Sequence, residues 1–219
     1  MKKLMITITL AALTMMAHAQ QFSIGARAGL NMTNAEGVWR YDGNKSLTSL
    51  YAPGFNVGVV GNLVFGKTDF SANFGLLFAQ TRVRALDNWK ADKYAYRYRA
   101  HINQLQVPIN LQYNLFGTGL FMQAGPYLGF NLGGKWKTDE VDGNGKETNR
   151  DGDIKFGSDP LKHDSKAFDF GVGLGLGIQA NSARIAFTYN LGIANLYNGD
   201  DDKTKHRNRG LMVTLTYLF

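Results

Sequence analysis

Two segments of the chain carry arginine at alternate positions: Arg82, Arg84, Arg97 and Arg99. Alternate residues of a β-strand point to the same side, so a hairpin of two such strands would gather the four side chains on one face. Lys90 and Lys93 lie between the segments, near the expected hairpin tip. Because guanidinium groups match the geometry of phosphate, the cluster predicts a site for a phosphate-rich ligand, with an ordinary solvated surface as the alternative.

A second cluster is acidic and lies in a glycine-rich stretch: Asp139, Asp142, Asp151 and Asp153. Clustered carboxylate oxygens are the ligands that Ca²⁺ prefers. The spacing does not match an EF-hand, because Lys146 falls at a would-be ligand position, and a solvated surface loop is the preferred interpretation. The chain contains no cysteine, which excludes Cys/His zinc sites and thiol nucleophiles. We therefore expect no metal and no cofactor.

The elements that must position these residues are β-strands, because apolar residues recur with a period of two. In residues 168–180 the even positions are apolar and the odd positions are glycine or polar. Seven further segments alternate in the same way: 22–31, 55–65, 70–78, 104–115, 120–133, 184–193 and 211–219. Large apolar side chains outside and small or polar ones inside are typical of a narrow membrane barrel. The pattern predicts an all-β fold, an eight-stranded antiparallel up-and-down transmembrane β-barrel.

The connections between these strands alternate in length. Long polar loops are expected at 32–52, 85–96, 137–165 and 196–207, and short turns near 66–68, 117–118 and 181–182. Outer-membrane barrels have long extracellular loops and short periplasmic turns, which would place both chain ends in the periplasm. Residues 1–19 have the basic start, apolar run and small-residue cleavage site of a secretory signal peptide, which leaves residues 20–219 as one barrel domain.

The same alternation places six polar side chains inside the barrel: Arg27, Arg184, Asp169, Gln104, Gln106 and Gln112. Eight strands leave an interior just wide enough for side chains to fill, so we expect a hydrogen-bonded polar plug. The alternative is a proton or ion path. Pro108 and Pro126 lie in adjacent strands and lack the N–H donor of a ladder, which predicts a bulge or a broken ladder where these strands meet.

Four motifs resemble the PorT-like outer membrane β-barrel family of Bacteroidetes, an OmpA/OmpX-type eight-stranded barrel. They are GARAGLN at 25–31, LQVPINLQY at 105–113, GPYLG at 125–129 and DFGVG at 169–173. Gln106 and Gln112 stand where the family often has glutamate and lysine, which removes the charges for an ion pair there. The family takes its name from a member needed for protein secretion and surface export of proteases. The resemblance therefore implies, as an alternative, an accessory role in a secretion or envelope system.

The predicted membrane position gives the arginine cluster a specific ligand. Residues 70–78 supply an apolar span close to the ~9–11 residues that a tilted transmembrane strand needs. The arginines beyond this span should emerge above the outer leaflet, where lipopolysaccharide is rich in phosphate. Loss of Lys2 and Lys3 with the signal peptide would lower the formal charge from +7 to +5, which suits an anionic lipid surface and is too weak to indicate nucleic acid.

The preferred interpretation is a monomeric outer-membrane protein with a structural or surface-interaction role. Its expected partners are outer-membrane lipids, lipopolysaccharide and an unidentified envelope or surface protein. A lipid A-modifying enzyme is a further alternative. Such chemistry on a small barrel needs an activated serine beside a histidine. No spacing ties His101 to Ser46, Ser49 or Ser165, so we expect no enzymatic activity.

Overall fold

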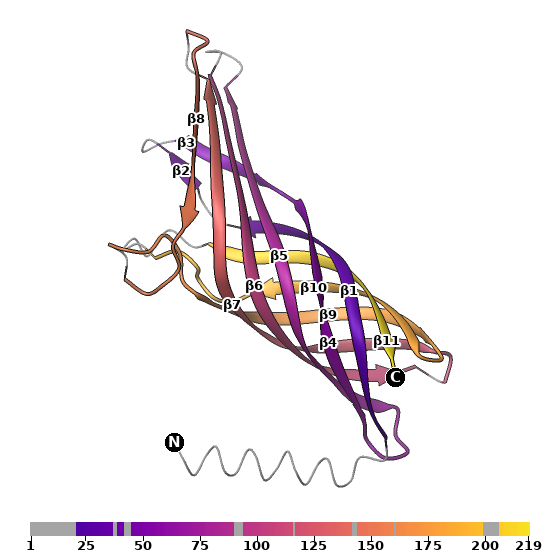
Figure 1. Ribbon diagram of the computed structural model, residues 1–219. Coiled ribbons are helices and arrows are strands. Elements are labelled where there is room, and N and C mark those ends of the chain that lie inside the picture. Colours follow the sequence, from indigo (N-terminus) through magenta and orange to yellow (C-terminus); the bar gives the residue numbers. More distant parts are fainter. Residues whose placement is uncertain are drawn as a thin grey trace.

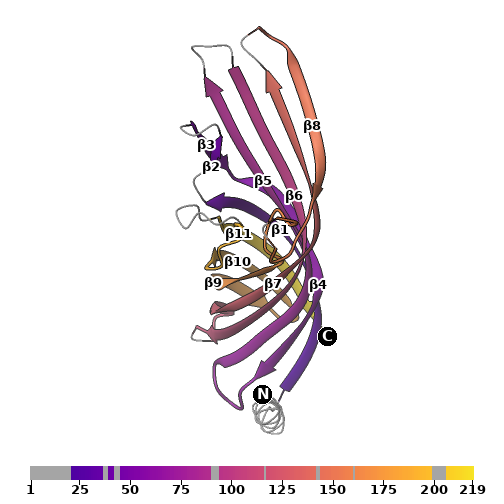
Figure 2. The ribbon, with the colours of Figure 1, turned by 90° about the vertical axis from the view of Figure 1, so that its left-hand side faces the viewer.

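Eight long strands form a closed ring, and each pairs antiparallel with the strand on either side (Figure 1, Figure 2). In this computed structural model the ring strands are, in order, β1 (Gln21–Glu36), β4 (Ala52–Val64), β5 (Phe70–Trp89), β6 (Tyr94–Asn114), β7 (Leu120–Val141), β9 (Phe168–Ala180), β10 (Ala183–Gly192) and β11 (Arg207–Leu218). β11 pairs back onto β1 and closes the ring. Neighbours in the ring are neighbours in sequence, so the predicted eight-stranded up-and-down fold is confirmed.

The structure describes residues 21–36, 39–41, 45–89, 94–115, 117–141, 144–159, 161–198 and 206–219. The predicted signal peptide, residues 1–19, lies outside these ranges. Within them, no helix is long and apolar enough to cross a membrane.

Several ring strands continue past the barrel and form an extended sheet at the end opposite the short turns (Figure 1). β8 (Glu147–Ile154) pairs with β7, and β3 (Lys45–Leu50) pairs with both β5 and β2 (Trp39–Tyr41). The loops predicted at 32–52, 85–96 and 137–165 are therefore largely strands, and that part of the prediction was wrong. The apolar alternation ends where contact with lipid ends, but pairing goes on because it satisfies backbone N–H and C=O groups in water as well.

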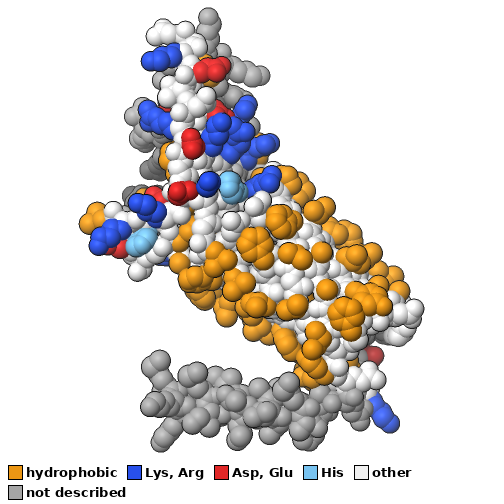
Figure 3. All heavy atoms as spheres, in the orientation of Figure 1, with side chains coloured by type: hydrophobic (Ala, Val, Ile, Leu, Met, Phe, Trp, Pro, Cys, Tyr) orange, Lys and Arg blue, Asp and Glu red, His pale blue; other side chains and the backbone are white. Residues whose placement is uncertain are grey.

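The barrel wall is apolar outside and polar inside. Large apolar side chains from every ring strand are exposed and cover the lower body of the molecule in Figure 3. Ring pairs such as Phe70 with Tyr113, 4.8 Å apart between centroids, and Tyr217 with Phe219, 5.5 Å apart, lie near the short turns. Aromatic girdles of this kind mark the membrane–water interface of outer-membrane barrels.

The three short turns occur where they were predicted, after β4, β6 and β9. Gly66 and Gly117 have φ of 59° and 65°, and Asn181 has φ of 52°. Left-handed backbone of this kind is readily adopted by glycine and tolerated by asparagine. These turns therefore owe their tightness to residue types that are visible in the sequence.

The glycine run on the inner side of β9 makes room for aromatic side chains from β7. A Cβ atom on Gly177 would lie 2.3 Å from Cζ of Phe121, and one on Gly171 would lie 2.7 Å from Cε1 of Tyr127. Phe121 and Tyr127 are both buried. Large side chains on one strand thus fill the space beside small residues on the next, as a narrow barrel requires.

The ladder between β6 and β7 is interrupted at the two prolines, as predicted. Pairing runs up to Pro108–Tyr127 and resumes in the same register at Leu111–Ala124. The pairs in between, which include Pro126, are missing from the ladder, because proline has no N–H to donate. A separate register shift lies between Asn103 and Gln104.

A charged substitution on the outward apolar face should lower the stability of the barrel most strongly halfway between the two ends of this face. Leu174 lies midway along β9 and is 63% exposed. We expect Leu174→Arg to lower the free energy of unfolding in lipid bilayers by about 2–4 kcal/mol, because it would bring a cation to the bilayer midplane. Leu161→Arg is the control, since Leu161 is 94% exposed in the loop after β8 and should change stability little. Urea titrations in vesicles would measure both, and equal effects would contradict an outward, lipid-facing β9.

Candidate functional site

Basic side chains gather on the outward face of β5, β6 and β7, directly above the apolar surface (Figure 3). We call this group the basic rim, and it consists of Arg82, Arg84, Arg97, Arg99, His101, Lys135 and Lys137. A row of amides separates it from the apolar band, in which Gln80 Nε2 donates a 3.2 Å hydrogen bond to Asn103 Oδ1. The four predicted arginines thus come together on one face, whereas Lys90 and Lys93 lie outside the described residues.

The strand register arranges the basic rim in rows. Arg82 pairs with His101, which pairs with Lys135 in the row nearest the apolar band. In the next row Arg84 pairs with Arg99, which pairs with Lys137. Neighbouring strands are about 4.8 Å apart, and rows two residues apart are roughly 7 Å apart. Like charges directly opposite each other destabilise a sheet, so the row of Arg84, Arg99 and Lys137 costs stability unless an anion offsets it.

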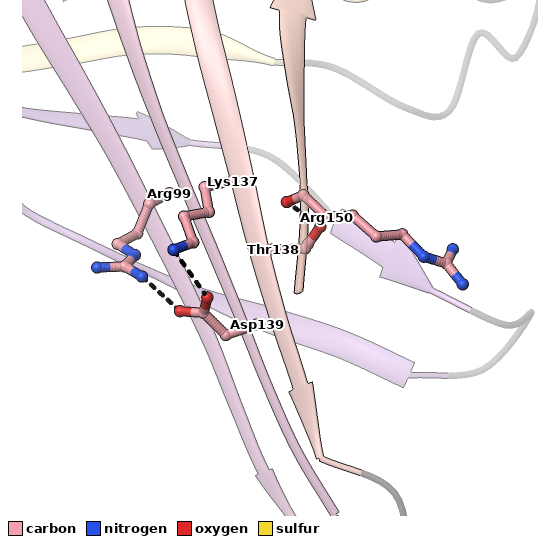
Figure 4. Close-up of polar contacts among 5 residues, drawn as sticks. All are labelled: Arg99, Lys137, Thr138, Asp139 and Arg150. Atoms are coloured by element: carbon pink, nitrogen blue, oxygen red, sulfur yellow. Dashed lines mark hydrogen bonds and ion pairs between the residues drawn. The ribbon is translucent and has the colours of Figure 1, made fainter. Parts of the chain in front are cut away.

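Three carboxylates offset part of this charge, and two of them, Asp151 and Asp153, lie on β8 opposite Lys137 and Lys135. Asp139 forms an ion pair with Arg99, and its Oδ1 lies 3.8 Å from Nζ of Lys137 (Figure 4). Arg150 extends away from this group in the same view, and its carbonyl oxygen accepts a 3.4 Å hydrogen bond from Thr138 Oγ1. The rim therefore keeps a net positive charge.

Lys135 and Lys137 were missed because a β-bulge changes the phase of β7. Asn103 pairs with Gly133, but Gln104 pairs with Asn131, so β7 holds one extra residue at this point. Even positions of β7 are exposed before the bulge, and odd positions are exposed after it. Strict alternation from Leu132 would have pointed both lysines inward. The adjacent glycines, Gly133 and Gly134, are a sequence signal for such a bulge.

The acidic residues considered as a Ca²⁺ loop lie on two paired strands. Asp139 faces Arg99, while Asp151 and Asp153 lie on β8 opposite Lys137 and Lys135. Asp142 lies outside the described residues. Among the residues that are described, no three His, Asp or Glu side chains are grouped as metal ligands would be.

The six polar residues assigned to the interior are all buried, and Asp169 is 0% exposed. Five of the six belong to two separate hydrogen-bonded groups. Near the short turns, Arg184 donates to Gln179, Asn62 and Gln112 at 2.7, 2.9 and 3.3 Å, and Arg27 donates to Thr216 and Asn73 at 2.9 and 2.7 Å. Near the extended sheet, Oδ2 of Asp169 accepts from Gln104 and Asn208 at 3.3 and 3.4 Å. Gln106 lines two small cavities between these groups.

The inner side of the extended sheet carries aromatic residues. Tyr98 is largely buried there, and burial, with the nearby Tyr96 and Asp164, raises its pKa to about 12. The phenol of Tyr98 therefore stays neutral at every physiological pH. The two faces of the sheet thus differ, with basic residues outside and an uncharged aromatic inside.

The residues considered for lipid A chemistry lie apart. His101 lies in the basic rim between Arg82 and Lys135. The hydroxyl of Ser165 donates a 2.9 Å hydrogen bond to the carbonyl of Leu196, in the loops beyond β8 and β10. The side chains of Ser46 and Ser49 lie outside the described ones.

Comparison with known proteins places these observations in a family. The model of the outer membrane protein beta-barrel domain matches residues 18–198. No curated protein sequence matches the chain. Similar solved structures include Ail of Yersinia pestis, in complex with the heparin analogue sucrose octasulfate (13% identity, 91% of this chain and 100% of that one, TM-score 0.39), and Neisserial surface protein A (12%, 91% and 100%, 0.44). The Pseudomonas putida toluene transporter TodX also matches (11%, 91% and 90%, 0.21). Nothing about the ligands of this chain follows from likenesses of this size.

The like charges of Arg84 and Arg99 predict that two substitutions should change the stability of the sheet in opposite directions. Arg84→Gln should stabilise the ligand-free sheet by about 0.2–1 kcal/mol, because it removes repulsion from Arg99. Asp139→Asn should destabilise it by a similar amount, because it removes the ion pair with Arg99. Urea unfolding at low salt would measure both, and high salt should shrink both. A destabilising Arg84→Gln would show that the row is not under electrostatic strain.

Proposed function

The chain belongs to the outer membrane protein beta-barrel domain family, and on this premise we propose that it is a surface-interaction barrel whose basic rim binds lipopolysaccharide phosphates. The observation that carries the proposal is the position of the rim. Two rows of basic side chains lie one amide row above an apolar band, on the outward face of β5, β6 and β7. Phosphates of the outer leaflet would lie at this height, where arginine forks can bind them with two hydrogen bonds each.

The proposed orientation follows from the loops. The short turns and both Gln21 and Phe219 lie at one end of the barrel, and the extended sheet lies at the other. We assign the turn end to the periplasm and the sheet to the cell exterior, as in barrels of this size. The rim then faces the outer leaflet, and the sheet presents its surface to partners outside the cell.

The rim is tested by a charge-matched pair of variants. Arg82, Arg84, Arg97 and Arg99 are changed together to glutamine in one variant. The control changes four exposed cations outside the rim: Arg150, Lys155, Lys162 and Lys166. We expect the first variant to bind purified lipopolysaccharide at least about tenfold more weakly, a loss of roughly 1.4 kcal/mol, and the control to bind normally.

Two further arms of this experiment identify the ligand group. Dephosphorylated lipopolysaccharide should bind wild type and the rim variant equally weakly, because the phosphate contacts are absent in both cases. The electrophoretic shift of the folded barrel on heating shows that each variant folds. Unchanged binding by a folded rim variant would remove the proposal.

The proposed barrel has no open pore, because polar and aromatic side chains occupy its interior. The two small cavities beside Gln106 have volumes of about 20 Å³ each, enough for about one or two water molecules. We therefore expect no stepwise conductance when the pure protein is reconstituted in planar bilayers, with a porin as positive control. Stable conductance steps would contradict the plug.

The accessory role in a secretion or envelope system stays a prediction from the PorT-like motifs. It is compatible with the same rim, since a barrel fixed in the outer leaflet can also present its extended sheet to a protein partner. Lipid A modification stays an alternative. The strand partners of His101 are Arg82 and Lys135, and neither is a serine.

A further inference from the structure

Two arginines converge inside the barrel. Arg27 on β1 and Arg184 on β10 both pair with Thr216 of β11, so they stand in one row on either side of it. Both side chains extend into the interior past their neighbouring strands, where Arg27 donates to Asn73 of β5 and Arg184 to Asn62 of β4. Asn62 and Asn73 are themselves directly paired between β4 and β5. Directly opposed side chains have Cβ atoms about 4.5–5.5 Å apart, so the two guanidinium groups meet at neighbouring points.

Among the described residues, the groups that accept hydrogen bonds from these two cations are all neutral. Arg27 is 8% exposed and donates to a hydroxyl and an amide, while Arg184 is 6% exposed and donates to three amides. Asp169 is engaged elsewhere, and within the described residues neither arginine has a carboxylate within ion-pair distance. Burying an uncompensated charge is costly, and a second charge of the same sign beside it adds repulsion. The electrostatic potential around these two arginines therefore favours the binding of an anion.

The interior also has room for a small one. A cavity of about 20 Å³ lies against Arg27, and its polar lining includes Asn110, Gln123 and Thr188. This volume accommodates a single small ion or a water molecule but no organic anion.

We propose that the barrel interior binds one small inorganic anion, chloride in its natural setting, in the cavity beside Arg27 and within the field of Arg184. The ion offsets one of the two positive charges and so reduces the repulsion between Arg27 on β1 and Arg184 on β10. Its role is to stabilise the closed ring, and it binds independently of the basic rim.

Bromide provides a direct test that needs no variant. Crystals of the folded barrel grown with bromide in place of chloride should show an anomalous-scattering peak at hydrogen-bond distance from the Arg27 guanidinium. The absence of such a peak, or peaks at the basic rim alone, would overturn the proposal. Ordinary density without an anomalous signal would identify a water molecule instead and would equally overturn it.

Stability in different salts provides the second test. At constant ionic strength, replacing gluconate by chloride at a hundred times its Kd should raise the apparent melting temperature of the micelle-bound barrel by roughly 5–11 °C. Arg27→Gln should abolish this shift, and the charge-matched control Arg150→Gln, on the extended sheet, should keep it. Equal shifts in both variants, or equal melting temperatures of wild type in the two salts, would contradict an interior chloride site.

Discussion

The structure depends on one constraint, which is that backbone N–H and C=O groups inside a bilayer must be paired within the protein. A closed ring of antiparallel strands meets it without leaving an edge. Closure at eight strands then fixes the width of the interior, so that side chains fill it. The apolar outer face, the glycine run of β9 filled by Phe121 and Tyr127, and the polar interior all follow from this geometry.

The same ladder has a second use where the membrane ends. Because pairing remains favourable in water, β5, β6 and β7 continue past the apolar band and carry their side chains with them at fixed spacing. The basic rim is therefore held on strands and not on loops. A site held on paired strands keeps its geometry without a ligand, which reduces the entropy that binding must overcome.

Arginine side chains are in electrostatically unfavourable positions at two places in the molecule. Cations face each other across the rows of the basic rim, and Arg27 and Arg184 meet in the interior with neutral partners. Local departures of this kind are expected at functional sites, where the cost is offset by a bound group. The rim is open to large phosphate-bearing ligands, whereas the interior admits only a small ion, so the two sites differ in ligand by size alone.

The sequence by itself determined the number of strands in the ring, the face of each ring strand that meets lipid, the short turns and the break at the two prolines. These features depend on residue type and on alternation within one strand, and both are local. Only the tertiary structure decided where strands end outside the lipid, because polar residues alternate there without a hydropathy signal. It also decided the orientation of Lys135 and Lys137, since a single extra residue in β7 reverses every later position. The meeting of Arg27 with Arg184 depends on how the closed ring curves β1 and β10 toward each other on either side of β11, and ring closure is a property of all eight strands at once.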